Sequence, residues 1–375
     1  MLEAATDLLN RSVAAVTAPA AAVAAAAVHD DVMTWLSAAL TYHDTCRDGL
    51  HEEVDADGKD GRPVKAQMLL YLANLREHLS NSLAIFKAWG APDGDVSGGV
   101  TVQKRQLLST SSGHGDLTFP APRWVKHSDR RLLDAPTADI VPDMVVAKDG
   151  SGTHLSIGDA VEAAPVHSAH RVVIYIKAGV YSENVKDTLY AHAQRQLYRD
   201  CEVAGTVDAV FGNAAAVLQN CTLRARGPLP GQKNTVTAQG RADPNQSTGF
   251  SVHGCRLVPS PEMVRAVRGE YSTYLGRPWK PYARVVYMSS YMGGHVDAAG
   301  WLAWDASARA PDDTVYYGEY QNYGPGAELE GRVAWPGHRV ITLAEEAMEF
   351  TVRSFIGGYS WLPATGVPFV GGLTA

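Results

Sequence analysis

Two aspartates, Asp187 and Asp208, each stand in a run of small and apolar residues, twenty-one positions apart. A pair of carboxylates can share the work of a hydrolysis, because one group attacks as a nucleophile while the other gives and takes a proton. The two groups must lie close together for this, and like charges at short range push their pKa values apart. The alternative is that both are turn residues on a surface. The choice depends on the elements that position them.

Four short segments between Leu197 and Met292 share one pattern, in which apolar residues flank a small Cys or Ser. They read LYRDCEV, LQNCTL, VHGCRL and VYMSSYM. Repeats with one strand pattern per turn predict a solenoid, and the lack of regularly placed Asn-Gly turns favours a parallel β-helix over a sandwich. A coil of about 20–25 residues would put Asp187 and Asp208 at the same place on successive coils, about 4.8 Å apart.

The first ninety residues are predicted to be helical. The segment PVKAQMLLYLANLREHLSNSLAIFKAW has one apolar stripe at steps of three and four, made of Met68, Leu72, Leu75, Leu79, Leu83 and Phe86. Before it, DDVMTWLSAALTYHDTC predicts a second helix with Asp31 as its cap. The Ala-rich run Val13–Val28 is weakly apolar and contains Pro19, which favours a bundle helix over a membrane span.

Composition narrows the function classes. A net charge of −7 and a pI near 6.0 argue against non-specific nucleic-acid binding, although a locally basic groove could still accept a polyanion. The four cysteines are too few for a disulfide scaffold and have no metal-type CxxC spacing. The start of the chain has no signal-peptide pattern, and Gly90 to about Asp139 has a linker-like composition rich in Gly, Ser and Pro.

Several specific blocks occur in one order along the chain: GVYSENV, KDTLY, GTVDAVFGNAAAV, QSTGF, TYLGRPWKPYARVVYM and YYGEYQNYGPGA. Together they resemble plant pectin methylesterase over nearly the whole chain. The amino-terminal helices, above all TWLSAALTYHDTC, resemble the inhibitor-like pro-region of that family. The pair Arg130 and Arg131 in RRLL resembles the processing site between pro-region and enzyme.

The resemblance implies a mainly β protein. Its fold would be a right-handed parallel β-helix, a single-stranded solenoid, preceded by a truncated α-helical bundle. The expected domains are an inhibitor-like bundle at 1–90, a linker at 91–139 and the pectinesterase β-helix at 140–375.

The resemblance also assigns roles to the carboxylates. Asp208 matches the nucleophile that attacks the ester carbonyl, and Asp187 matches the general acid that protonates methanol and then activates water. Arg277 matches the guanidinium that holds the nucleophile, a task that suits a planar and permanently charged fork. No cofactor or metal is implied.

Aromatic and cysteine positions match the family as well. Trp279 and Trp301 match residues that stack on sugar rings, with Tyr190 and Phe211 as their neighbours, and ordinary core packing is the alternative for all four. The resemblance further implies a disulfide between Cys221 and Cys255. Pairing of Cys201 with Cys221 remains open, and Cys46 is expected to be free.

The sequence departs from the family pattern beside the acid aspartate. Lys186 stands where the family has a glutamine, and a second glutamine, in a Gln-Ala-Val-Ala segment, is absent. YSENV runs directly into KDTLY, so several coils between them are missing. Both amide donors of the oxyanion hole are therefore lost, and one such donor typically contributes about 10²–10³ in turnover. Ala209 also stands where an aromatic residue is usual.

The expected function is a pectinesterase that converts galacturonan methyl esters to pectate and methanol in the plant cell wall. The first alternative is a catalytically impaired variant that binds pectin or another esterase, because both glutamines are missing. A lyase is a weaker alternative, since its calcium site would need clustered carboxylates. The expected partners are methylated homogalacturonan and a processing protease at RRLL, with no nucleic acid and no membrane span, and the chain is expected to be a monomer.

Overall fold

The structure is a computed structural model of the 375-residue chain. It describes residues 2–17, 25–52, 62–89, 144–147, 149–155, 160, 163, 174–176, 187–265, 271–304 and 313–374. The chain divides into two compact units, Met1–Val102 with Lys186–Ala375, and Gln103–Val185. The expected linker at 91–139, with Arg130 and Arg131, lies outside the described residues.

In the second unit, β1 (Met144–Val146) and β2 (Ile174–Ile176) form a parallel pair. The remaining strands belong to the first unit. They are β3 (Leu189–Tyr190), β4 (Arg195–Arg199), β5 (Glu202–Gly205), β6 (Val210–Gly212), β7 (Ala215–Gln219), β8 (Thr222–Ala225), β9 (Asn234–Gln239), β10 (Gly249–His253), β11 (Arg256–Pro259), β12 (Thr273–Pro278), β13 (Arg284–Met288), β14 (Tyr291–Met292), β15 (Tyr316–Tyr320) and β16 (His338–Val340).

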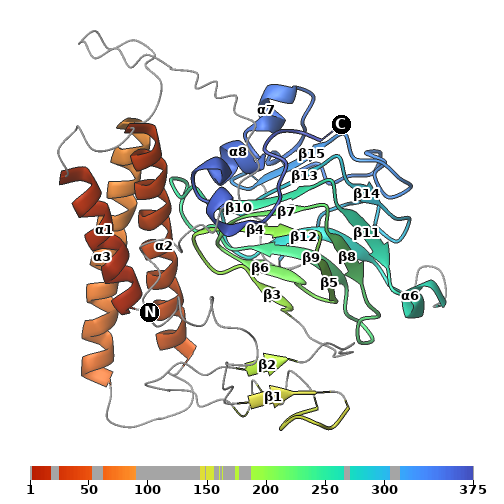
Figure 1. Cartoon of the computed structure of the whole chain (residues 1–375), viewed down its shortest axis with the longest axis horizontal. Coiled ribbons are helices and arrows are strands. Elements are labelled where there is room, and N and C mark those ends of the chain that lie inside the picture. Colours follow the sequence, from red (N-terminus) through yellow and green to blue (C-terminus); the bar gives the residue numbers. More distant parts are fainter. Residues whose placement is uncertain are drawn as a thin grey trace, which may run out of the picture. The chain divides into compact units, whose positions relative to one another are not determined.

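These strands stack into three parallel sheets, as Figure 1 shows. One sheet has the order β12-β9-β6-β3, the second β16-β15-β13-β10-β7-β4, and the third β14-β11-β8-β5. From β3 to β14, successive strands of the chain pass from one sheet to the next, so each coil adds one strand to every sheet, whereas β15 and β16 extend only the second sheet. This is the parallel β-helix that the repeated segments predicted.

The repeated Cys or Ser marks the corner between the second and third sheets. Each corner contains one residue in the left-handed region, at Asp200, Asn220, Gly254, Ser289 and Gln321. Asn, Asp and Gly tolerate this conformation best, which explains why the corners read DC, NC and GC. The corners also bond to one another, since the Nδ2 of Asn220 donates to the Oδ1 of Asp200 at 2.6 Å.

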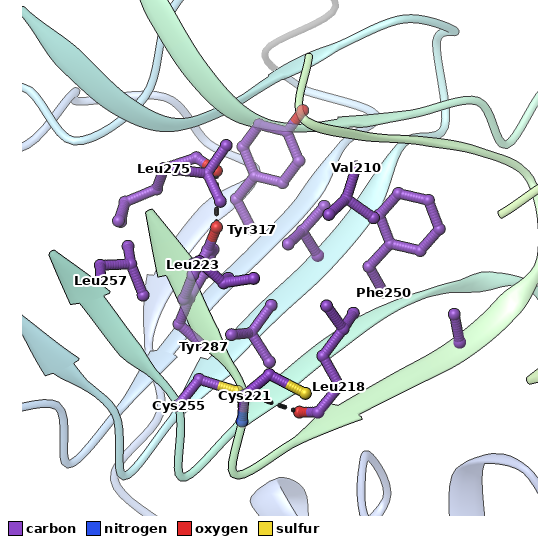
Figure 2. Packing of buried hydrophobic residues seen from close by; sticks show 14 of the residues in the cluster. Val210, Leu218, Cys221, Leu223, Phe250, Cys255, Leu257, Leu275, Tyr287 and Tyr317 are labelled. Carbon is purple, nitrogen blue, oxygen red and sulfur yellow. Dashed lines mark hydrogen bonds between the residues drawn. The ribbon is translucent and has the colours of Figure 1, made fainter. Parts of the chain in front are cut away.

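Large apolar side chains fill the interior of the solenoid (Figure 2). Phe250, Leu218 and Tyr287 are completely buried. The hydroxyl of Tyr287 donates to the carbonyl of Leu275 at 2.7 Å, so the one polar atom of this side chain is satisfied within the core.

The disulfide expected between Cys221 and Cys255 is not formed, because both residues are free thiols, as are Cys46 and Cys201. The sulfurs of the expected pair bond to backbone carbonyls instead. The Sγ of Cys255 contacts the oxygen of Leu218 at 3.3 Å, and that of Cys221 contacts the oxygen of Tyr198 at 3.4 Å. The stacking of coils therefore brings these residues to adjacent corners without a covalent bond between them.

The amino-terminal helices are α1 (Leu2–Thr17), α2 (Ala25–Glu52) and α3 (Arg62–Trp89). The stripe predicted on the last of these is confirmed, since Leu72, Leu79 and Leu83 are buried. Asp31 is not a cap, because α2 begins six residues earlier and the Asp31 carboxylate accepts from Arg195 of the solenoid. Among the described residues, no helix is both long and apolar enough to cross a bilayer.

The short helices follow the later strands. They are α6 (Pro261–Arg265), α7 (Ala344–Met348), α8 (Val352–Phe355), η2 (Gly358–Ser360) and η3 (Leu362–Thr365).

A buried histidine on β10 makes the stability of the solenoid dependent on pH. His253 is completely buried, and burial, helped by the charge of Arg199, lowers its pKa to about 4. Its neutral Nε2 accepts from the backbone N–H of Thr374 at 3.1 Å. A depressed histidine pKa contributes stability above the unfolded value of about 6.5, and that stability is lost as pH falls through about 4.

We therefore expect His253→Gln to remove about 3 kcal/mol of the difference in unfolding free energy between pH 7 and pH 4. Urea unfolding at both pH values measures it. His78→Gln, at an exposed position of α3, is the matched control and should leave the difference unchanged. An equal pH dependence in wild type and His253→Gln would contradict the assignment.

Candidate active site

Asp187 and Asp208 occupy equivalent positions on adjacent coils. Leu189 of β3 is paired with Val210 of β6, so each aspartate precedes its paired residue by two positions. The backbone N–H of Asp187 donates to the carbonyl of Val207 at 3.2 Å. Both aspartates have left-handed backbones, with φ of 58° and 55°. The sequence interval of twenty-one residues is thus one coil of the solenoid.

Arg277, on β12, holds the carboxylate of Asp208 with a two-pronged contact. Its Nε donates to Oδ1 at 2.8 Å and its Nη2 donates to Oδ2 at 2.6 Å. The hydroxyl of Thr235 on β9 donates to the same Oδ1 at 2.6 Å. These charge-assisted bonds fix the direction of both carboxylate oxygens. Because Asp208 is only 5% exposed, bulk water screens the bonds little.

Three of the four expected aromatic residues lie in one row, which we call the aromatic row: Tyr190, Phe211 and Trp279. The first two rings are stacked at 4.5 Å between centroids, and the centroid of Trp279 lies 6.2 Å from that of Phe211. Tyr190 is 43% exposed, so the row reaches solvent. Gly240 leaves room for the ring of Trp279, because a Cβ at position 240 would lie 2.8 Å from that ring.

Trp301 does not belong to this surface, contrary to its expected role in stacking on sugar rings. It is 1% exposed, and its ring stacks on Tyr317 at 4.0 Å inside the solenoid. Its Nε1 donates to the buried carboxylate of Glu319 at 3.3 Å. Core packing, the alternative weighed for the aromatic residues, is correct at this position.

Sequence reasoning missed Trp304, which is 40% exposed. The guanidinium carbon of Arg277 lies 4.2 Å from the centroid of its ring, so this tryptophan is the one beside the Asp208 carboxylate. The only available signal was its place three residues after Trp301 in the segment GWLAW.

The two tryptophans should respond differently to truncation. Trp304→Ala is expected to weaken binding of a sugar polymer by about 2–10-fold, the size of an aromatic contact, with an unchanged melting temperature. Trp301→Ala should instead lower the unfolding free energy by about 3–5 kcal/mol, as for other buried aromatics. Thermal melting and a polysaccharide-binding isotherm on both variants measure these effects. A destabilised Trp304→Ala with normal binding would overturn the assignment.

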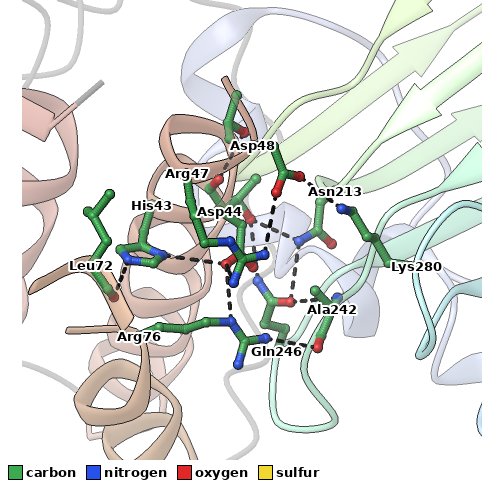
Figure 3. Close-up of polar contacts among 12 residues, drawn as sticks. His43, Asp44, Arg47, Asp48, Leu72, Arg76, Asn213, Ala242, Gln246 and Lys280 are labelled. Carbon is green, nitrogen blue, oxygen red and sulfur yellow. Dashed lines mark hydrogen bonds and ion pairs between the residues drawn. The ribbon is translucent and has the colours of Figure 1, made fainter. Parts of the chain in front are cut away.

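Helix α2 contacts the same part of the solenoid (Figure 3). Asp48 forms an ion pair with Lys280 at 2.8 Å, and Thr45 bonds to the Nε2 of His192, next to the aromatic row, at 2.9 Å. A small cavity of about 20 Å³ is lined by both partners, including Asp48, Tyr190 and Trp279. Burial at this contact lowers the pKa of His192.

Two further positions complete the comparison with the sequence. Lys186, expected at the place of an oxyanion donor, lies outside the described residues. Ala209 is buried, and a Cβ added to Gly205 would lie 2.8 Å from the Cβ of Ala209, so the Ala209 methyl group packs tightly against Gly205. Among the described residues, no cluster of His, Cys, Asp and Glu is suited to hold a metal ion.

Comparison with known proteins agrees with this geometry. The family model "Pectinesterase" matches residues 143–186 and 185–359, and "Plant invertase/pectin methylesterase inhibitor" matches residues 1–85. A curated relative, "Probable pectinesterase/pectinesterase inhibitor 34" of Arabidopsis thaliana, is 40% identical over 459 aligned positions that cover 100% of this chain and 73% of the relative. "Pectinesterase 3" of Solanum lycopersicum is 35% identical and is covered over 78% of its length, with 100% of this chain aligned.

The solved structure "Pectin methylesterase from Carrot" is similar to the described fold. It is 38% identical, with a TM-score of 0.50, over 64% of this chain and 100% of that one. The alignment to the Arabidopsis relative is longer than the 375 residues of this chain, so that relative contains residues that this chain lacks. The two parts matched by the pectinesterase model meet at residues 185–186, where the sequence predicted missing coils.

Proposed function

This chain belongs to the pectinesterase family, a family of carboxylic ester hydrolases, and we propose that Asp208, Asp187 and Arg277 are its catalytic residues. One observation carries the proposal: a buried carboxylate is held by a two-pronged arginine, one coil away from a second aspartate in register with it. The aromatic row and Trp304 lie beside it, and aromatic faces suit the apolar faces of pyranose rings. The substrate that fits this site is methylated homogalacturonan.

The reaction would proceed in two steps. An oxygen of Asp208 attacks the ester carbonyl carbon, and the bond to methanol breaks as Asp187 gives its proton to the departing oxygen. Asp187, now ionised, takes one proton from water, whose oxygen attacks the acyl carbon and releases the Asp208 carboxylate and a galacturonic acid group. That acid group then loses the second proton to solvent and becomes the galacturonate carboxylate. Arg277 directs the attacking oxygen throughout. No step is assigned to Lys186.

The same proposal covers the organisation and location of the chain. The family matches at 1–85 and 143–359 support a helical region at 1–90, a linker at 91–139 and an esterase region at 140–375. Cleavage after Arg130 and Arg131 by a processing protease would separate the two regions. We place the activity of the protein in the plant cell wall, as a monomer.

Methanol release from highly methylated pectin by the full chain tests the function directly. We expect the wild-type chain to release methanol. Asp48→Asn should raise this release by up to about fivefold, because the partly exposed ion pair between Asp48 and Lys280 contributes about 0.2–1 kcal/mol to holding α2 on the solenoid. Asp7→Asn, which removes an exposed pair within α1, is the control. If neither wild type nor Asp48→Asn releases methanol from folded protein, the impaired variant becomes the correct description.

A further inference from the structure

Thr235 on β9 lies in register with the two aspartates, on the next coil of the solenoid. Val210 is paired with Thr237. Asp208 and Thr235 each precede these paired residues by two positions, just as Asp187 and Asp208 precede the pair on the coil before. The three residues therefore form one column, which carries a carboxylate, a second carboxylate and a hydroxyl on successive coils.

Three different groups of Thr235 contact the segment that contains Asp208. The backbone N–H of Thr235 donates to the carbonyl of Thr206 at 3.3 Å, and its own carbonyl accepts from the N–H of Ala209 at 3.1 Å. Its side-chain oxygen accepts from the backbone N–H of Asp208 at 2.9 Å and donates its proton to the Oδ1 of the same residue at 2.6 Å. One threonine thus holds both the backbone and the side chain of Asp208.

The backbone of Asp208 needs such support. Its φ of 55° lies in the left-handed region, which a residue other than glycine keeps mainly where surrounding contacts fix it. Thr235 is 1% exposed and Asp208 is 5% exposed, so water competes little for the bonds between them. A hydroxyl suits both ends of Asp208, because it can accept from the N–H and donate to the carboxylate at the same time.

The two carboxylate oxygens of Asp208 accept different numbers of hydrogen bonds. Oδ1 accepts from the Nε of Arg277 and from the hydroxyl of Thr235. Among the described residues, Oδ2 accepts only from the Nη2 of Arg277. A carboxylate oxygen has two lone-pair sites, so both sites of Oδ1 are occupied while one site of Oδ2 is free. An oxygen needs a free electron pair to form a bond to carbon, which favours Oδ2.

We propose that Thr235 is a positioning residue that holds Oδ1 of Asp208, so that Oδ2 is the oxygen that attacks the ester. This inference rests on the proposed function, in which Asp208 is the nucleophile. The free lone pair of Oδ2 forms the bond to the carbonyl carbon. The bond from that carbon to the methoxy oxygen then breaks, and this oxygen keeps the electron pair and takes its proton from Asp187. Thr235 acts through Oδ1 and the N–H of Asp208 and takes no part in these bond changes.

The kinetic test compares Thr235→Val with Thr235→Ser in the full chain. Valine has nearly the shape of threonine but no hydroxyl, so the N–H of Asp208 loses its acceptor and Oδ1 loses a donor. A nucleophile that is no longer held in line with the ester loses rate rather than affinity. We expect Thr235→Val to lower kcat for methanol release from methylated pectin by about 10–100-fold, with KM within about twofold of wild type.

Thr235→Ser keeps the hydroxyl and should keep kcat close to that of wild type. If the valine variant fails to fold, the serine variant decides the question alone. A folded Thr235→Ser whose kcat is at least about tenfold lower would overturn the role of the hydroxyl. A Thr235→Val that melts at a lower temperature but keeps the wild-type kcat would show that the hydroxyl only supports the fold.

Thr237→Val is the matched control. Thr237 lies on the same strand, is completely buried and donates its hydroxyl to the carbonyl of Leu275 at 2.9 Å. That carbonyl also accepts from the hydroxyl of Tyr287, so it keeps a donor in the variant. Thr237→Val should therefore turn over pectin as wild type does. A kcat as low in this control as in Thr235→Val would show a general effect of changing β9 and would overturn the inference.

Hydrogen exchange followed by NMR separates this inference from the proposed function, because it needs no ester turnover. The amide of Asp208 should exchange about tenfold faster or more in Thr235→Val than in wild type, Thr235→Ser and Thr237→Val. The amide of Ala209 is the internal reference, since it bonds to the backbone carbonyl of residue 235, which every variant retains.

The two measurements together distinguish the ways to fail. Equal exchange of the Asp208 amide in wild type and Thr235→Val would overturn the inference even if wild type releases methanol. Faster exchange in Thr235→Val, together with a folded wild type that releases no methanol, would overturn the proposed function and with it the choice of Oδ2 as the attacking oxygen.

Discussion

Asp208→Asn is expected to lower methanol release from methylated pectin by about 10⁴-fold or more, the scale on which a catalytic nucleophile is lost. The amide has nearly the shape of the carboxylate, so it can still accept from Arg277 and Thr235. It lacks the charged oxygen that would attack the ester carbonyl. Pectin binding should persist, because the aromatic row and Trp304 are unchanged.

The matched control is Asp200→Asn. Asp200 has the same left-handed φ of 55° on the same solenoid, but it is exposed at a corner on another side. Asparagine tolerates that conformation as well as aspartate does, so activity and stability should both stay close to wild type. Methanol release by Asp208→Asn at the rate of Asp200→Asn would show that Asp208 is not the nucleophile.

Arg332→Met is expected to lower the unfolding free energy by about 3–5 kcal/mol and the melting temperature by about 10 °C. Arg332 and Glu319 form a buried ion pair whose side chains are 3% and 2% exposed, with Nε and Oε1 3.0 Å apart. Bonds from His338 and Arg332 lower the pKa of Glu319 although burial raises it. Removing Arg332 leaves the carboxylate of Glu319 buried with its negative charge largely uncompensated. The Nε1 of Trp301 still donates to this carboxylate, but it carries no charge.

Two comparisons isolate the buried charge in thermal and urea unfolding. Arg339→Met removes an arginine whose side chain is 51% exposed and should change stability by less than about 1 kcal/mol. The double variant Glu319→Leu with Arg332→Met should recover much of the loss, because no unpaired charge remains. A single variant as stable as Arg339→Met would exclude the pair as a main support of the core.

The coil repeat of the solenoid, and the register of the two aspartates that depends on it, could be predicted from the sequence alone. Local patterns carry this information: the corner residues Asp200 and Asn220 tolerate a left-handed backbone, and the small residue after each corner recurs once per coil. From the coil length, the register of Asp187 with Asp208 follows. The apolar stripe on α3 could also be predicted from the sequence, because helical spacing depends only on residues three and four positions apart.

Side-chain burial was not determined in this way. Trp301 and Trp304 stand three residues apart in one apolar segment, yet one packs against Tyr317 in the core and the other lies beside Arg277 on the surface. The direction of each ring depends on coils that are distant in sequence. The resemblance implied a disulfide between Cys221 and Cys255, but whether their sulfurs bond to each other depends on side-chain rotamers.

The tertiary structure also decided every contact between distant regions. Asp31 has the sequence context of a helix cap, but an arginine of the solenoid binds its carboxylate inside α2. Lys87, Arg195 and Arg284 line one cavity, although they come from three separate segments of the chain. Periodicity is a local property that a sequence displays directly, whereas a cluster of charges exists only after folding brings distant residues within reach of one another.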